Sequence, residues 1–340
     1  MGKVITFGEI MMRLNPDGYQ ELLQASNLNV SFAGGEVNAA VSIANFGMKA
    51  DFVTKIPENI LGKRVAMELR KYGVGVENIV YGGPRLGIYF VEKGVSQRPV
   101  KVLYDRENSS MALSKRQDYD WDKILEDASW FHFTGITPAL GGECAQICKD
   151  ALEACRRKQI TVSCDINYRK KLWSEDEAEK VMSELMEYID VCFINEGQAK
   201  DVFKIHGAYE TDPSDSGRLK NCADVAKKIS EKFHCRIVAS TIRTSISASI
   251  NDWSGMLYKD NKVYYSPLYR IQIVDRVGGG DSFAGALIYA LKSGYDDQTA
   301  LDFATAASCL KQTIEYDFNL CSVEDVKSLM ENQNMGYVQR

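Results

Sequence analysis

Three consecutive glycines followed by an aspartate are the residues of this chain whose types and spacing most directly suggest chemistry. The segment reads Gly278-Gly279-Gly280-Asp281. Glycine lets a backbone turn tightly and approach a ligand, and the N–H groups at a helix start suit an anion. An acid here repels a phosphate that is only bound, but it can take a proton beside a phosphoryl group in transfer. The spacing therefore indicates phosphoryl-transfer chemistry.

Two commoner glycine motifs are excluded. A P-loop requires G-x-x-x-x-G-K, and although Gly280 and Gly285 have this spacing, Ala286 replaces the lysine. A dinucleotide fingerprint requires G-x-G-x-x-G, and Phe283 occupies the place of its third glycine. The alternative left open is a purely structural connection with Asp281 as a helix N-cap. One glycine would suffice for that alternative.

The glycine turn lies between a predicted strand over 271–274 and a predicted helix that is apolar on nearly all sides. Such a helix is expected to lie buried between layers. From residue 129 onward, strand and helix patterns alternate, which predicts a mostly parallel sheet covered by helices. The predicted strands are 130–134, 161–165, 191–195 and 237–240, and the predicted helices are 143–158, 176–187, 197–204 and 221–233.

Ligands of such sheets bind beyond the carboxyl ends of the strands. Polar residues follow each of these strands, at Thr134-Gly135, Asp165 to Arg169, Asn195-Glu196 and Ser240-Thr241. Together with the glycine turn they predict one site at this edge of the sheet.

The first hundred residues predict a strand over 3–7, a helix over 39–47, a strand over 50–55 and a helix over 62–71. Residues 12–32 have an irregular, mixed pattern. Two strand-like runs, 87–92 and 100–106, predict an antiparallel hairpin. Its face with Val100, Val102, Tyr104 and Arg106 is either a binding surface or an ordinary half-buried strand face. A polar segment over 206–220 is expected to be a surface loop.

Composition narrows the class of protein. The 340 residues are 45% hydrophobic and 26% charged, as in ordinary globular proteins. A net charge of −5 without a basic block argues against nucleic acid, since phosphate neutralisation dominates that affinity. No apolar run approaches the ~20 residues that span a bilayer. The N-terminus has the pattern of a first strand and not of a signal peptide.

Nine cysteines without a C-x-x-C pair fit a reducing, cytoplasmic setting. Cys144, Cys148 and Cys155 share one helical face, where small buried core residues are expected. The three histidines fit no ligand spacing, so no structural zinc is expected.

At this point the residues resemble a known family. Asp275 to Asp281 resembles the D-T-x-G-A-G-D signature of the ribokinase-like, PfkB-type carbohydrate kinases, and Gly34 to Asn38 is similar to their N-terminal Gly-Gly-x-x-Asn. Within the family the chain most resembles 2-keto-3-deoxygluconate kinases. That likeness rests on Gly8 to Leu14 (G-E-x-M-x-R-L), Tyr89-Phe90, Arg98-Pro99, Tyr104 to Arg106, Asp165 to Trp173 (D-x-N-x-R-x-x-L-W) and Thr313 to Phe318 (T-I-P-G-D-F).

The resemblance implies a Rossmann-like α/β fold, with a mostly parallel central sheet flanked by helices and a small β-sheet lid. It implies one kinase domain over 1–340, with the lid formed by about 12–32 and 86–106. It also implies ATP-dependent phosphorylation of a sugar hydroxyl with Mg²⁺, and a homodimer formed through the lid.

The family's site residues match positions of this chain. Asp281 matches the catalytic base, and the amides of Gly278, Gly279 and Gly280 match the anion hole. Positions that match sugar or sugar-acid contacts are Gly34, Gly35, Asn38, Tyr89, Tyr104, Arg106, Arg169 and Asp317. Positions that match contacts to the nucleotide are Asn167, Asn195, Ser240, Arg243, Gly278 and Gly280. Glu196 is a candidate for an indirect contact to the metal.

Arg106 and Arg169 suit a keto acid better than a neutral hexose, because a guanidinium fork matches a carboxylate. Two departures from the family pattern stand out, Arg276 in place of threonine and Gln198 in place of the glutamate of N-x-x-E. Residues 240–247 also lack the family's K-x-G-x-x-G pattern. The alternatives are a kinase for a neutral sugar or a nucleoside, and a non-catalytic sugar-binding relative.

Overall fold

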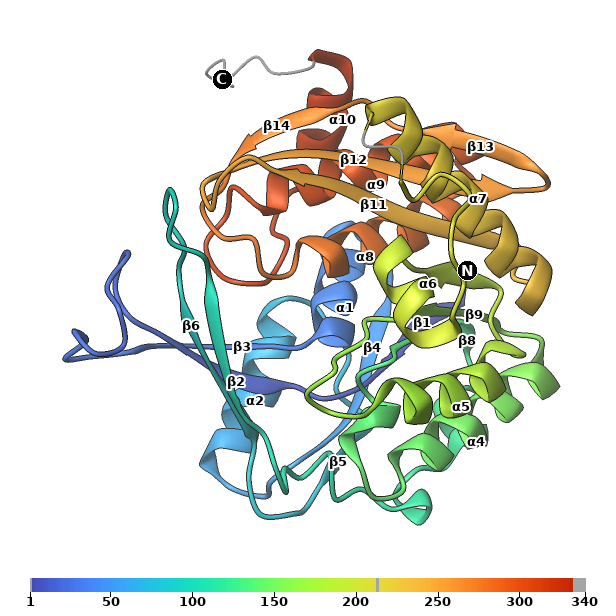
Figure 1. The fold of residues 1–340 in the computed structure, drawn as a ribbon. Coiled ribbons are helices and arrows are strands. Elements are labelled where there is room, and N and C mark those ends of the chain that lie inside the picture. The colour runs from blue at the N-terminus through green and yellow to red at the C-terminus, as the bar shows by residue number, and fades with distance from the viewer. Residues whose placement is uncertain (1, 212–213, 333–340) are drawn as a thin grey trace.

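A ten-stranded, mostly parallel sheet forms the centre of the computed structural model, which describes residues 2–211 and 214–332 (Figure 1). Its strand order is β13-β12-β11-β10-β9-β8-β1-β4-β5, and β14 pairs with β12. Their bounds are β1 Lys3–Phe7, β4 Ala50–Ile56, β5 Ile79–Tyr81, β8 Ala128–Thr134, β9 Thr161–Asp165, β10 Val191–Phe193, β11 Ile237–Ser245, β12 Ile250–Lys259, β13 Lys262–Tyr265 and β14 Tyr269–Gln272. The strands from β11 to β5 are parallel, and β12 to β14 pair antiparallel.

Helices cover both faces of this sheet. Their bounds are α1 Gly35–Asn45, α2 Ile60–Lys71, α3 Trp121–Ile124, α4 Cys144–Lys158, α5 Glu175–Met186, α6 Glu196–Phe203, α7 Asp215–Phe233, α8 Gly279–Lys292, α9 Asp297–Lys311 and α10 Val323–Asn332. Successive side chains of a strand point to opposite faces. In β1, Val4 therefore joins the apolar core with α1, α8 and α9, and Ile5 joins the core with α4, α5 and α7.

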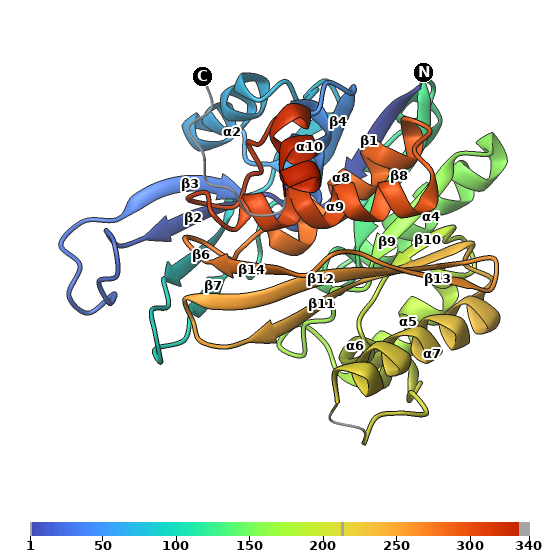
Figure 2. The ribbon, with the colours of Figure 1, turned by 90° about the horizontal axis from the view of Figure 1, so that it is seen from above.

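A second sheet stands beside the main body (Figure 2). Its order is β3-β2-β6-β7, with bounds β2 Met11–Asn15, β3 Asn29–Ala33, β6 Gly87–Glu92 and β7 Lys101–Asp105. The two segments expected to form a small sheet, 12–32 and 86–106, supply all four strands. The predicted α/β architecture with a second small sheet is thus confirmed.

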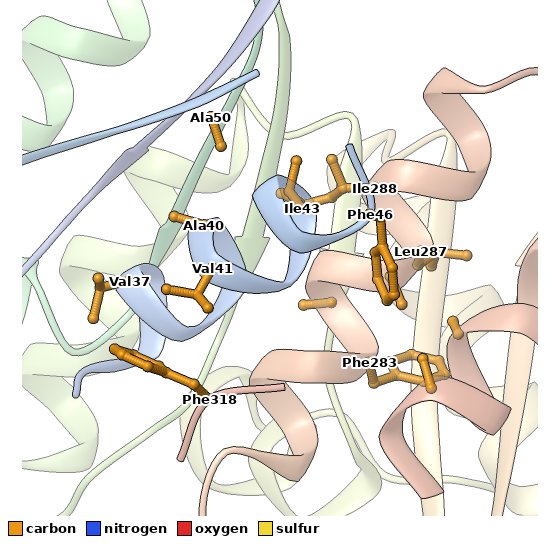
Figure 3. Packing of buried hydrophobic residues seen from close by; sticks show 14 of the residues in the cluster. Val37, Ala40, Val41, Ile43, Phe46, Ala50, Phe283, Leu287, Ile288 and Phe318 are labelled. Atoms are coloured by element: carbon orange, nitrogen blue, oxygen red, sulfur yellow. The ribbon is translucent and has the colours of Figure 1, made fainter. Parts of the chain in front are cut away.

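Helix α1 packs closely along α8, and this contact sets the position of the glycine turn (Figure 3). A Cβ atom on Gly285 of α8 would lie 2.8 Å from the backbone oxygen of Ala39 in α1. Without a side chain at Gly285 the two helix backbones can approach, which brings the first turn of α1 beside the first turn of α8. Val41 of α1 and Phe283 and Leu287 of α8 belong to the buried apolar cluster around this contact.

Most predicted elements are confirmed, and three expectations need correction. Residues 12–32 contain most of β2 and β3, and their sequence pattern is irregular because the polar Arg13 and Asn15 lie on the buried face of β2. The polar segment 206–220 is in part helical, since α7 begins at Asp215 with the Ser214 hydroxyl accepting from the Gly217 amide. Residues 212–213 of that segment lie outside the described residues. The strand expected at 271–274 is β14, two residues earlier.

All nine cysteines are free and buried. The prediction that Cys144, Cys148 and Cys155 are buried on one face of a helix, here α4, is confirmed. In the part of the chain that the structure describes, no helix combines the length and apolarity that crossing a bilayer would need.

Candidate active site

The glycine turn requires glycine at its first position. Gly278 is the N-cap of α8, with φ 84° in the left-handed region. A Cβ atom there would lie 2.2 Å from the backbone oxygen of Asp317. Both the positive φ and this close approach exclude a side chain.

The start of α8 presents backbone N–H groups that an anion could accept. Among the described residues the amides of Gly278 and Gly280 have no hydrogen-bond acceptor, while the Gly279 amide donates to the Arg276 oxygen at 3.3 Å. Gly280 is exposed, and a Cβ there would meet no atom within 4 Å. Two of the three predicted anion-hole amides therefore have no acceptor in the described chain, and the third makes one long hydrogen bond.

The buried side chain of Lys311 binds the backbone just before the glycine turn. Its side chain is fully buried at the end of α9, and its ammonium donates to the backbone oxygens of Asp275, at 3.0 Å, and Val277. Burial lowers the pKa of Lys311. A buried cation bonded to these carbonyls fixes the path of the chain just before the glycines.

Arg13, on β2 of the small sheet, binds one acid before the glycine turn and one acid in the segment after α9. Its side chain has no exposed surface and donates to Asp317 Oδ1 and to Asp275 Oδ2, each at 2.6 Å. The Tyr89 hydroxyl donates to the other oxygen of Asp317 at 3.0 Å. Asp317 and Tyr89, both predicted to contact sugar, are thus engaged with protein groups.

Asp281, the predicted base, makes no ion pair within residues 2–211 and 214–332. Its carboxylate accepts from Asn38 Nδ2 at 2.6 Å. Burial raises the pKa of Asp281 to about 6, although the Asn38 hydrogen bond opposes this rise. Gly35 lies next to it, since a Cβ there would be 3.6 Å from Asp281 Oδ1. The carboxylate is therefore held in place by an amide and stays able to accept a proton.

Two further carboxyls lie near Asp281. Burial, followed by the negative charge of Asp281, raises the pKa of Asp165 to about 7. Burial likewise raises the pKa of Glu36 to about 7, against hydrogen bonds from Thr137 and Thr134. The family resemblance gives neither acid a role, although Asp165 begins the polar segment that is predicted to lie at this edge of the sheet. The site thus concentrates carboxyl groups whose charged form burial disfavours.

A cleft of about 510 Å³ extends from the glycine turn over the carboxyl ends of β9, β10 and β11. All of the residues predicted to contact the nucleotide line it, namely Asn167, Asn195, Ser240, Arg243, Gly278 and Gly280. Arg169, Glu196, Gln198 and Arg276 line the same cleft, beside Asp281. Asn195 is the N-cap of α6, and its side chain and that of Gln198 exchange hydrogen bonds with each other's backbone amides.

Three predicted sugar contacts lie apart from this cleft, on the small sheet. Tyr104 stacks on Tyr89, with ring centroids 6.0 Å apart. Arg106 is buried and donates through Nε to Glu9 at 2.8 Å, so its charge is paired. Gly34 connects the residues of the small sheet with those around Asp281. Its amide donates to Asn38 Oδ1 at 3.3 Å, and a Cβ atom on it would lie 2.0 Å from the Glu9 backbone oxygen.

Prediction from sequence missed Arg13 and Lys311 as parts of the site. Arg13 has a signal in the alternation of β2, where Met11, Arg13 and Asn15 share the buried face. Lys311 has the weaker signal of a single cation at the end of a largely apolar helix.

Comparison with known proteins gives similar chains over nearly the whole length. The crystal structure of 2-dehydro-3-deoxygluconokinase from Thermotoga maritima superposes with a TM-score of 0.93, at 46% identity, and covers 97% of this chain and 98% of that one. A 2-dehydro-3-deoxygalactonokinase of Haloferax volcanii is 29% identical, covering 98% of each chain. A 5-dehydro-2-deoxygluconokinase of Clostridium perfringens is 24% identical, over 98% of this chain and 94% of its own.

The family model described as pfkB family carbohydrate kinase matches residues 1–315. This match includes the N-terminal glycine pair, the small sheet, the cleft and the glycine turn with Asp281. The chain therefore belongs to the pfkB family of carbohydrate kinases.

Proposed function

We propose that this kinase transfers the γ-phosphoryl group of ATP to a hydroxyl of 2-keto-3-deoxygluconate or a closely related sugar acid. The observation that supports this most strongly is the arrangement at the start of α8. There a carboxylate without an ion pair, Asp281, stands next to backbone amides that have no acceptor in the described chain. A base and an anion site side by side are the two parts that phosphoryl transfer needs.

In this proposal Asp281 accepts the proton of the acceptor hydroxyl and orients its oxygen toward the phosphorus atom. Asn38 fixes the carboxylate at 2.6 Å without neutralising it. The amides of the glycine turn hold the phosphoryl oxygens while negative charge shifts among them. The Gly278 and Gly280 amides are available at once, and the Gly279 amide would exchange its long bond for the anion.

The nucleotide is expected in the 510 Å³ cleft, with Asn167, Asn195, Ser240 and Arg243 around it. Mg²⁺ would enter with the ATP, since this ion keeps several waters and takes one or two carboxylates together with phosphates. Glu196 and Asp165 supply carboxylates to the cleft, and we propose an indirect contact for Glu196. Gln198 is already engaged in capping α6.

The preference for an acid rests on Arg169. This side chain is exposed at the cleft, beside Asp281, and has no ion-pair partner in the described part of the chain. An unpaired guanidinium suits a carboxylate or a phosphate. Arg106 contributes less positive charge than expected, because Glu9 neutralises it. The three relatives described above are named as kinases of dehydro-deoxy sugar acids, which agrees with this preference.

We also propose that the small sheet is a lid and a dimer interface. Its Lys93 pairs with Glu315 near Asp317, and Arg13 and Tyr89 bind Asp317, so the sheet is connected to the site at several points. On its other face an apolar row crosses all four strands, formed by Val30, Leu14, Phe90 and Leu103. Val30 is 42% exposed and Leu103 58% exposed. A second copy could cover this row.

We predict that Asp281→Asn lowers kcat by about 10²- to 10⁴-fold, the usual contribution of a general base. Asparagine keeps the shape of the side chain but cannot accept the proton. ADP release from purified protein with saturating sugar and ATP measures the effect. Asp260→Asn, in the left-handed turn between β12 and β13, is the control and should match the parent. Equal turnover of the parent and Asp281→Asn would show that the base is another group.

An acceptor screen tests the substrate class. We expect the highest kcat/KM with 2-keto-3-deoxygluconate or its galactonate isomer, and little turnover of fructose, ribose or nucleosides. Arg169→Ala should raise KM for the acid, because it removes the unpaired cation at the cleft. Turnover of a neutral sugar with none of any keto acid would refute the assignment of a sugar-acid substrate while leaving the kinase assignment intact.

For the dimer, we predict that Leu103→Asp yields a monomer, since it places a charge on the edge strand of an apolar row that the second copy would bury, and an unpaired buried charge is costly. Light scattering coupled to gel filtration gives the mass. Ile60→Asp places the same charge on an exposed apolar residue of α2, outside the small sheet, and should leave the mass unchanged. A parent protein that is already monomeric at micromolar concentration would contradict the proposed interface.

A further inference from the structure

Arg276 is the residue of the glycine-turn segment for which neither the fold nor the proposed base chemistry gives a reason. It stands where the family signature has threonine, and it lines the cleft together with the three glycines and Asp281. The side chain is half-buried. A long cation at this position therefore points to a partner inside the cleft.

Arg276 has no ion-pair partner within the described protein, and the adjacent negative charge of Asp275 offsets the lowering of its pKa only in part. No carboxylate pairs with it among these residues; its one hydrogen bond runs from Nη2 to the backbone oxygen of Ala248, at 3.0 Å. Its Nε atom is buried without an acceptor. A half-buried guanidinium with an unsatisfied N–H is costly unless an anion reaches it.

The neighbouring acid cannot supply that anion. Asp275 precedes Arg276 directly, but its Oδ2 accepts from Arg13 at 2.6 Å and its Oδ1 accepts from the Val277 amide at 3.1 Å. Both carboxylate oxygens are thus already used. Asp275 therefore pairs with Arg13 of the small sheet and with the backbone of the turn, and not with Arg276.

A second arginine strengthens the positive field at the same place. Burial, and after it the positive charge of Arg243, lowers the pKa of Arg276. Arg243 is exposed on β11 and lines the same cleft. Two guanidiniums that repel each other across a cleft wall are stabilised together by an anion with more than one charge.

The Ala248 contact also fixes the direction of the Arg276 side chain. The turn that contains Ala248 joins β11 to β12, and the tip of the small sheet rests on it. The Ala248 amide donates to the Ser96 oxygen at 2.8 Å, and the Ser96 amide donates to Ser249 Oγ at 2.9 Å. Arg276 is consequently held at one end by a segment that the small sheet supports, with the rest of its fork left for a ligand.

We infer that Arg276, with Arg243, binds the β- and γ-phosphates of ATP and thereby takes the place of the threonine in the family signature. This inference rests on the proposed use of ATP in the 510 Å³ cleft. The planar fork of arginine can bond two phosphate oxygens at once, which a threonine hydroxyl cannot do.

The test is equilibrium binding of AMP-PNP, ADP and AMP, each with Mg²⁺, to the parent and to Arg276→Ala by calorimetry. We expect AMP-PNP affinity to fall about 10- to 100-fold, the range for losing a hydrogen bond between charged groups. AMP, which lacks the β- and γ-phosphates, should bind nearly as before. Arg276→Lys keeps the charge and should recover part of the loss. Arg270→Ala, which removes an exposed arginine paired with Asp252 outside the cleft, should change none of the three affinities.

If Arg276 only stabilised the turn at Ala248, without binding phosphate, the binding measurements would give a different result. In that case the three nucleotides would weaken equally, or thermal unfolding would shift while no affinity changed, and either result would overturn the inference. If the parent binds AMP-PNP and phosphorylates sugar while Arg276→Ala binds AMP-PNP equally well, the inference fails and the proposed function stands. If the parent itself binds no nucleotide, both fail.

Discussion

The arrangement of the site depends on how one buried cation is shared. Arg13 has no exposed surface, and it donates hydrogen bonds to Asp275 at the start of the glycine turn and to Asp317 in the segment that follows α9. Both acids would otherwise be unpaired negative charges close to an anion site, and removing Arg13 would leave them so. Asp281, in contrast, has only an amide partner, Asn38. The separation of paired from unpaired carboxylates is what allows a base and a phosphate to coexist here.

Backbone packing completes this separation. The absence of a side chain at Gly285 lets α1 approach α8, which brings Asn38 to Asp281. The absence of a side chain at Gly278 leaves room for the backbone oxygen of Asp317, which would lie 2.2 Å from a Cβ atom there. Lys311 bonds the carbonyls just before the glycines from within the core. These are contacts between α1, α8, α9 and the segment around Asp317, so the geometry of the turn is set by the core and not by the turn alone.

The sequence predicts the α/β architecture, the glycine turn and the set of residues around the cleft, because each has a local pattern: alternation of strands and helices, glycine spacing, and polar residues at strand ends. The Arg13 network has no such pattern, since its partners lie 262 and 304 residues away along the chain. The pairing of Arg106 with Glu9, 97 residues away, is hidden for the same reason. Strands β2 and β3 are hard to predict from sequence, because the buried face of β2 carries the polar residues Arg13 and Asn15.

The most direct test of the central claim, that Asp281 is kept unpaired and able to take a proton, is the pKa of its carboxyl group. A pH titration of ¹³C-labelled aspartate carboxyls by NMR, with the Asp281 signal assigned by its absence in Asp281→Asn, gives that value. Because burial disfavours the charged form and no cation pairs with it in the described chain, the account predicts a pKa of about 6, so that the group is protonated below this pH. A pKa at or below 3.8, the ordinary value of an aspartate carboxyl group, would mean that a cation neutralises Asp281 and would contradict this explanation.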